Sequence, residues 1–176
     1  MKFLIPAFLA VVLPLPAAAQ SEHAHMSPYA GEQQREIKSL SAEDIAELSA
    51  GGGWGLAKPA ELNGVPGPSH VLKMKRELAL TADQERSAQR IFEEMRSEAV
   101  AEGKNLLAGE AALDAAFRDG GIEADHLRML LRRTEVSRAN LRYVHLAAHL
   151  RMARVLTRDQ VKRYNELRGY GAHPQP

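Results

Sequence analysis

Two long amphipathic segments, separated by Gly120-Gly121, constrain the fold of this chain more than any other feature. In each segment, apolar or small residues recur at steps of three, four and seven, the spacing of one helix face. A helix of about 37 residues is roughly 55 Å long and is not stable alone in water. The segments therefore predict an all-α fold built on a long antiparallel helical hairpin with short flanking helices. The recurring positions are Ala88, Ile91, Phe92, Met95, Ala99, Leu106, Leu113 and Phe117, then Leu127, Leu130, Thr134, Leu141, Val144, Ala148 and Val155.

A start signal precedes the first long helix and recurs after the second. In each case a threonine is followed three residues later by a glutamine, the spacing of a capping box. The second signal opens a short helix that we expect to run to Leu167, with Gly169 ending it. The hairpin helices themselves are expected to end at Gly120-Gly121 and near Leu156. The doubled motif consists of Leu80, Thr81 and Gln84, and of Leu156, Thr157 and Gln160.

Residues 20–79 are expected to form an N-terminal arm ahead of a hairpin domain at residues 80–170. Ser41 and Asp44 have capping-box spacing, which predicts short helices within residues 32–50. Glycines and prolines crowd residues 51–69, so this stretch cannot be one regular element. A further short helix is expected from His70 to Leu78, and residues 171–176 form a C-terminal tail.

Residues 1–19 have the features of a secretory signal peptide. A basic start at Met1-Lys2 precedes an apolar run, and Ala17-Ala18-Ala19 fits the small-residue cleavage pattern. The apolar run is short and interrupted by prolines, so the cleaved protein is not expected to span a membrane. The chain has no cysteine, which excludes disulfides, thiolate metal ligands and a lipoprotein anchor. These features predict a periplasmic location.

Charge is divided between the two long segments. Residues 81–125 carry 11 acidic and 5 basic side chains, whereas residues 127–168 carry 3 acidic and 11 basic side chains. An acidic helix beside a basic helix favours the hairpin and disfavours pairing of like helices between chains. The formal net charge is only +1 and aromatic residues make up 5% of the chain, which argues against nucleic-acid binding.

The doubled Leu-Thr-x-x-Gln motif and the long hairpin between its copies resemble the Spy/CpxP family of periplasmic proteins. The wider group includes the zinc-resistance-associated protein and a nickel/cobalt sensor. The resemblance covers residues 80–170. It implies an all-α periplasmic homodimer, often curved like a cradle. Such a protein holds unfolded or misfolded envelope proteins without ATP, responds to envelope stress through a sensor kinase, or takes part in heavy-metal resistance.

His145 and His149 lie four residues apart, which stacks their imidazoles on one helix face, and Met152 follows three residues later. This spacing suits Zn, Ni or Cu, but a third ligand is needed. Glu94 or Glu98 of the antiparallel helix could supply it, whereas His126 lies about 29 Å away along the same helix. The alternative interpretation, which the sequence favours, is that both histidines pack or hydrogen-bond beside the core.

A second group of metal-ligating side chains lies in the polar leader, where His23, His25 and Met26 are close in sequence. An imidazole and thioether tract of this kind binds copper weakly. The alternative is an ordinary polar leader. Whether or not these residues bind Zn, Ni or Cu, the sequence does not predict a required cofactor.

An arginine stripe follows the second long helix. It is either a surface for acidic clients or partners, or a solvated face paired with the acidic helix. Mechanistically, client binding needs an apolar patch beside these arginines; candidates include Val100, Leu107 and Val136. Trp54, in a glycine-rich loop, either latches the arm onto the hairpin or contacts clients. The predicted client surface consists of Arg128, Arg132, Arg138, Arg142, Leu146 and Leu150.

No nucleophile–base set, zinc-protease motif or phosphate-binding loop is visible, so an enzyme is not expected. The sequence leaves three functions open. The first is ATP-independent binding of unfolded envelope proteins, the second is metal binding in resistance or sensing, and the third is an adaptor for a sensor kinase.

Overall fold

Residues 27–170 are described by the computed structural model, and these residues contain helices and no strand. The described residues from Gln34 onward belong to one compact unit. The preceding unit contributes residues 27–33, in which backbone turns join Ala30 to Ser27 and Glu32 to Tyr29. A 3-10 helix, η1 (Glu32–Gln34), follows. Within the described range, no helix has the length and apolar character needed to cross a membrane.

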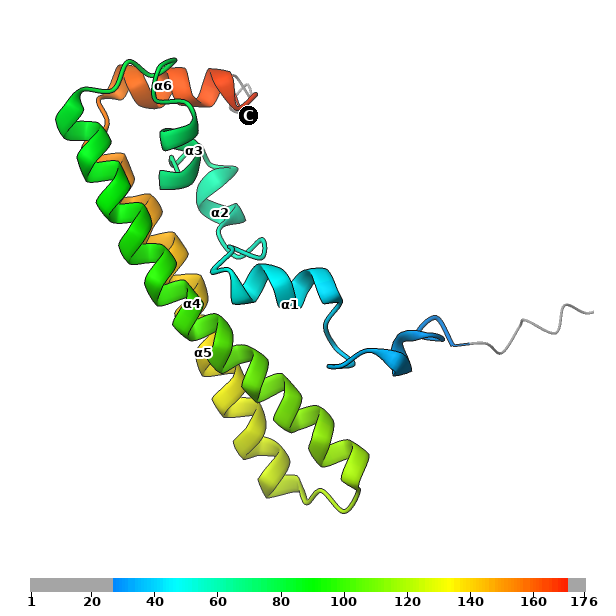
Figure 1. Ribbon diagram of the computed structural model, residues 1–176. Coiled ribbons are helices and arrows are strands. Elements are labelled where there is room, and N and C mark those ends of the chain that lie inside the picture. The colour runs from blue at the N-terminus through cyan, green and yellow to red at the C-terminus, as the bar shows by residue number, and fades with distance from the viewer. Residues whose placement is uncertain (1–26, 171–176) are drawn as a thin grey trace, which may run out of the picture. The chain divides into compact units, whose positions relative to one another are not determined.

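The predicted hairpin is confirmed. Helix α4 (Ala82–Asp119) and helix α5 (Ala124–Val155) run antiparallel and side by side, as Figure 1 shows in green and yellow-orange. Gly120 and Gly121, both with positive φ, form the connection. Ion pairs join the two helices between Arg138 and Glu110 and between Arg151 and Glu94. The division of charge therefore corresponds to contacts across the hairpin. The exposed Arg151–Glu94 pair stabilises little, whereas the Glu110 carboxylate of the other pair is buried.

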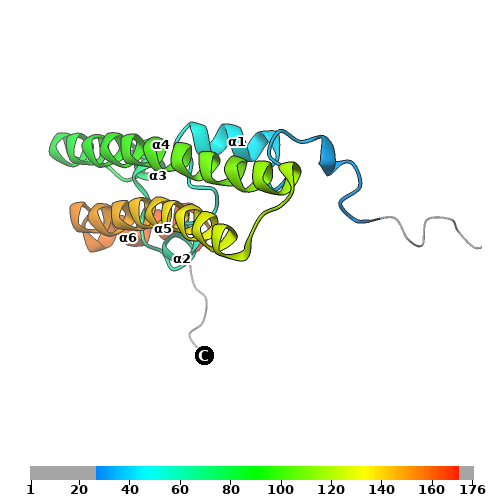
Figure 2. The same cartoon turned by 90° about the horizontal axis from the view of Figure 1, so that it is seen from below.

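Three short helices of the arm pack on one side of the hairpin. They are α1 (Ala42–Ser49), α2 (Lys58–Glu61) and α3 (Pro68–Lys73). Figure 2 shows α1 alongside α4, with α2 on the α5 side. The closest approach is at Gly103, where a Cβ atom would lie 2.3 Å from the Leu48 carbonyl oxygen. Only a glycine allows α1 to end this close to α4.

Some of the short helices predicted for the arm are confirmed by the structure. Ser41 and Asp44 form a capping box at the start of α1, and Gly51 follows with a φ of +74°. The helix expected from His70 to Leu78 is wrong in its bounds, because α3 begins at Pro68 and ends at Lys73. Beyond it the chain turns so that the Leu80 amide donates to the Lys75 carbonyl. This turn buries Leu78 and brings Thr81 to the start of α4.

Two hydrophobic clusters form the core, and both combine the hairpin with other elements. The first unites α4 and α5 with Ile37, Leu40 and Leu48 of the arm. The second lies at the open end of the hairpin, where α6 (Arg158–Leu167) crosses it (Figure 1). Its buried members are Val71, Leu78, Ala88, Met152, Leu156 and Tyr164.

Candidate functional site

The two copies of the Leu-Thr-x-x-Gln motif bind each other. Each threonine caps its helix, and each glutamine accepts a hydrogen bond from the backbone of its own threonine. The two glutamine amides also pair reciprocally: Gln84 Nε2 donates to Gln160 Oε1 at 2.8 Å, and Gln160 Nε2 donates to Gln84 Oε1 at 3.0 Å. The doubled motif therefore joins the starts of α4 and α6.

Each glutamine also reaches the backbone next to the other helix. Gln84 Nε2 donates to the Val155 carbonyl at 3.0 Å, and Gln160 Nε2 donates to the Leu78 carbonyl at 3.1 Å. Leu156 is buried beneath this arrangement and Leu80 is partly buried against the same cluster. The motif thus closes the open end of the hairpin, and its contacts are structural.

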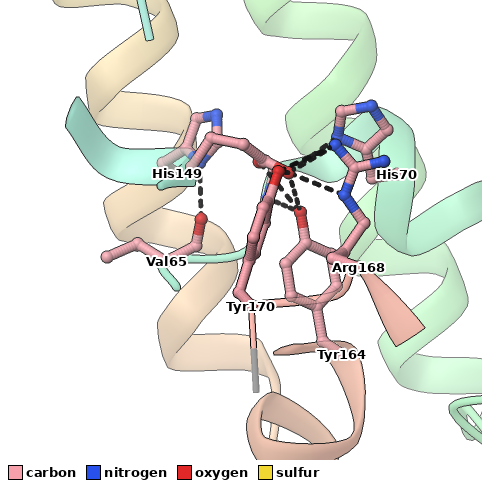
Figure 3. A network of polar contacts seen from close by, with 8 residues as sticks. Val65, His70, His149, Tyr164, Arg168 and Tyr170 are labelled. Carbon is pink, nitrogen blue, oxygen red and sulfur yellow. Dashed lines mark hydrogen bonds and ion pairs between the residues drawn. The ribbon is translucent and has the colours of Figure 1, made fainter. Parts of the chain in front are cut away.

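The histidine pair on α5 holds the arm. His145 Nε2 donates to the Gly52 carbonyl at 3.1 Å, and His149 Nδ1 donates to the Val65 carbonyl at 2.8 Å (Figure 3). A carbonyl only accepts, so these bonds place the proton of each neutral ring on the bonded nitrogen. Both side chains are buried. Burial lowers the pKa of His145, and the adjacent His149 acts in the same direction, against the Gly52 bond and Glu47.

The other predicted metal ligands do not form a site with the histidine pair in the described residues. Met152 is fully buried in the second hydrophobic cluster, whereas Glu94 pairs with Arg151. Glu98 and His126 are exposed. Among the described residues, no three His, Asp or Glu side chains are grouped so that they could hold a metal ion. The leader residues His23, His25 and Met26 lie outside the described residues.

A cavity of about 560 Å³ separates the glycine-rich loop of the arm from the hairpin. His145, His149, Phe92 and Met95 contribute to its lining from the hairpin. Gly51, Gly52 and Gly53 line it from the arm, together with Gly67 and His70. The histidines therefore lie at a boundary between arm and hairpin that is only partly filled.

A carboxylate without any distinguishing sequence pattern anchors α2 to α6 and the residues that follow it. Glu61 accepts hydrogen bonds from Tyr164 at 2.8 Å, from Arg168 Nε at 2.8 Å and from Tyr170 at 3.1 Å. His70 Nδ1 lies 3.5 Å from the same carboxylate, as the dashed lines in Figure 3 show. Burial raises the pKa of Glu61, but the Tyr164 hydrogen bond and the His70 and Arg168 charges outweigh it and keep the pKa below its ordinary value.

Arg138, a predicted client-surface residue, faces the arm. Its guanidinium lies 4.9 Å from the centre of the Trp54 ring and pairs with Glu110 at 3.1 Å. The Trp54 Nε1–H donates to Asp44 at 2.7 Å, and the ring packs against the first hydrophobic cluster. These contacts favour the interpretation of Trp54 as a latch for the arm.

The other predicted client-surface residues lie along α5. Arg128, Arg132 and Arg142 are exposed, and Arg128 pairs with Asp125 one turn away. Leu150 is 60% exposed and Leu146 is half-buried. Of the remaining apolar candidates, Val136 is exposed, Leu107 packs on the first cluster and Val100 lies against Gly51 of the arm.

Four of the five large apolar residues that α5 exposes form one row, which we call the outer stripe: Met129, Val136, Tyr143 and Leu150. Their exposed fractions are 58%, 59%, 73% and 60%. The fifth, Leu131, is 42% exposed and lies off this row. Buried residues such as Leu130, Leu141 and Ala148 lie on the opposite side of α5. Met129 and Tyr143 were not among the predicted residues, although the seven-residue spacing of the row is visible in the sequence.

Comparisons with protein-family models, curated proteins and solved structures found no match to this chain.

Proposed function

We propose that this protein is exported to the periplasm and binds unfolded or aggregation-prone envelope proteins without ATP. The observation that carries the proposal is the outer stripe with its neighbouring arginines. Four large apolar side chains, each more than half exposed, lie on the face of α5 that points away from α4 and the arm. Soluble proteins expose apolar rows of this kind mainly where they bind something. Arginines beside the stripe attract acidic chains at long range, and this attraction weakens as the salt concentration rises.

The test is suppression of aggregation of a thermally unfolded protein by the purified mature chain, without nucleotide. The variant Tyr143→Ser/Leu150→Ser removes half of the outer stripe and leaves the core intact. We expect it to need about ten-fold more protein for the same suppression. Leu62→Ser/Phe117→Ser is the matched control, because these side chains are equally exposed but lie off the stripe. Equal loss in both variants would contradict the proposal.

We also propose a second candidate function, metal binding in resistance or sensing. It is supported by the two buried imidazoles that lie one turn apart beside the cavity, each with one ring nitrogen bonded to a carbonyl and the other left for a ligand. Titration of metal-free protein with Zn²⁺, Ni²⁺ and Cu²⁺ tests it. Sub-micromolar binding that His145→Ala/His149→Ala removes, and His23→Ala/His25→Ala retains, would support this site; the reverse result would place binding in the leader.

The proposed partners follow from the same surface. Unfolded envelope proteins are the main class, and a sensor kinase is the alternative. Homodimerisation is also proposed, with the contact away from the outer stripe because arginines beside the stripe repel a second copy of it. Sedimentation of the wild-type protein and of Tyr143→Ser/Leu150→Ser tests this point, since the variant should keep the wild-type oligomeric state.

A further inference from the structure

The outer stripe has the period of a coiled-coil seam. Its four residues are spaced by seven, and the positions three residues further on are Arg132, Ala139, Leu146 and Ala153. Apolar residues that alternate at steps of three and four over four heptads are the pattern by which one helix packs against another. Only Arg132 interrupts the row. Over 25 residues the seam is about 37 Å long.

This seam is additional to the one that builds the hairpin. The buried residues of α5, including Leu130, Leu141 and Ala148, contact α4 and the arm from the opposite face. A helix needs one apolar face to pack into its own fold. The second face of α5 is therefore surplus to the hairpin. Its four stripe residues and Ala139 are exposed and can receive a helix from outside, while Leu146 and Ala153 are half-buried at its edge.

The flanks of the seam are basic. Arg128 and Arg142 lie on one side of it, and Arg133 and Arg154 on the other. Glu135 is the single acidic flanking residue, and it lies 3.4 Å from Arg138. Arg132, Arg133, Arg142 and Arg154 form no ion pair with any residue in the range 27–170. Charged residues beside a seam select the partner helix, so these flanks select an acidic one.

A second copy of the chain does not provide such a helix. Its own outer stripe would bring arginines against arginines in either orientation. Its acidic helix α4 exposes, among the described residues, no large apolar side chain except Phe117 near its end. Neither helix combines an acidic surface with an apolar row.

We propose that the outer stripe is one half of a two-helix coiled coil, and that its occupant is an acidic amphipathic helix of another protein. This inference rests on the proposed function and narrows it, because the surface then selects clients by helical register as well as by charge and apolarity.

Binding of three synthetic peptides of about 28 residues, four heptads, tests the inference. The first has Leu and Ile at the seam positions and Glu at the flanks. The second has the same composition in scrambled order, and the third carries Lys in place of Glu. Fluorescence anisotropy gives the affinities, and circular dichroism gives the helix formed on binding. We expect the acidic heptad peptide to bind about ten-fold or more tightly than the other two, with gain of helix and weakening in salt.

Two variants of the seam and its flanks, with one control, sharpen the test without touching the core. Val136→Glu places a charge in the seam and should abolish binding of the acidic heptad peptide, whereas Ala111→Glu, on the exposed surface of α4, should not change it. Arg133→Glu/Arg142→Glu should reverse the preference toward the lysine peptide. Retained binding by Val136→Glu would overturn the inference.

The inference and the proposed function fail in different ways. Equal affinity for the ordered and scrambled acidic peptides, with aggregation still suppressed, overturns the coiled coil and leaves the chaperone function standing. Selective binding of the acidic heptad peptide without suppression of aggregation supports the coiled coil and overturns the chaperone function. Self-association that Val136→Glu removes would show that a second copy occupies the seam, which also overturns the inference.

Discussion

Glutamine at the end of each Leu-Thr-x-x-Gln motif is explained by its amide group. The oxygen of Gln84 accepts from Thr81 and from Gln160, while its nitrogen donates to Gln160 and to the Val155 carbonyl. A glutamate completes the capping box equally well, but it cannot donate. The pairing of the two motifs therefore depends on the amide, which accounts for glutamine at both positions.

The first prediction concerns this amide. Gln84→Glu should retain the cap but leave the Val155 carbonyl without its donor and place a negative charge against it. We expect the free energy of unfolding to fall by about 1–3 kcal/mol. Urea denaturation followed by circular dichroism measures it. Gln34→Glu, an exposed position in η1, is the control, and an equal loss in both variants would contradict the role given to the pair.

The second prediction compares two glycines beside the histidine pair. A Cβ atom on Gly67 would lie 2.8 Å from the His149 ring, whereas one on Gly53 would lie 3.7 Å from the His145 ring, an ordinary contact. Gly67→Ala should lower the thermal unfolding midpoint through overpacking, by about 1–3 kcal/mol in stability, and Gly53→Ala should leave it almost unchanged. Similar effects of the two substitutions would mean that His149 is not fixed against the arm.

At the scale of elements, the hydrogen bond from the buried His145 to the Gly52 carbonyl makes the docking of the arm on α5 sensitive to pH. The pKa of His145 is lower in the folded protein than in the unfolded chain. Below the ordinary histidine pKa of about 6.5, the unfolded chain therefore binds more protons than the folded one, and stability falls as pH falls. Protonation places a second N–H on the His145 ring. Of its neighbours, His149 lowers the pKa of His145, whereas Glu47 raises it.

The third prediction follows from the loss of stability as pH falls. Between pH 7.5 and pH 5.5, the protection of the amides of residues 51–67 against hydrogen exchange, corrected for the pH dependence of intrinsic exchange, should fall more than the protection of amides in the middle of α4. His145→Gln retains a donor for the Gly52 carbonyl but does not titrate, so it should reduce the pH dependence. Unchanged pH dependence in this variant would show that His145 is not the group responsible.

The helices themselves were largely predictable, because their signals are local. Periodicity and caps gave α4, α5 and α6 almost to the residue, since Thr81, Thr157 and the Gly120-Gly121 turn act within a few positions. The end of α3 was not predictable in this way. It depends on the turn that buries Leu78, which is a requirement of the tertiary core and leaves no capping signal at Lys73.

At the scale of the whole molecule, the candidate site was predictable only where its residues share one helix. The arginines and part of the outer stripe could be identified because α5 is continuous. In contrast, the contacts that position the arm join residues far apart in sequence, such as Val65 with His149 and Glu61 with Tyr164. Their partners are a backbone carbonyl and a carboxylate within a glycine- and proline-rich stretch, and neither type follows a sequence pattern.

The last prediction concerns the arm as a cover for the hairpin. Ile37, Leu40 and Leu48 share the first cluster with α4 and α5, and Val71 and Leu78 share the second. Removing residues 27–79 would therefore expose an apolar face opposite the outer stripe and leave His145 and His149 without their carbonyl partners. We expect residues 80–170 alone to unfold at a lower temperature and to bind an apolar fluorescent dye more strongly than the full mature chain. Because the outer stripe is unchanged in the fragment, its preference for the acidic heptad peptide over the scrambled one should persist at temperatures where the fragment is still helical. A fragment as stable as the full chain would show that the arm contributes little to the core, and loss of the peptide preference in a helical fragment would show that the arm, rather than α5 alone, forms the binding surface.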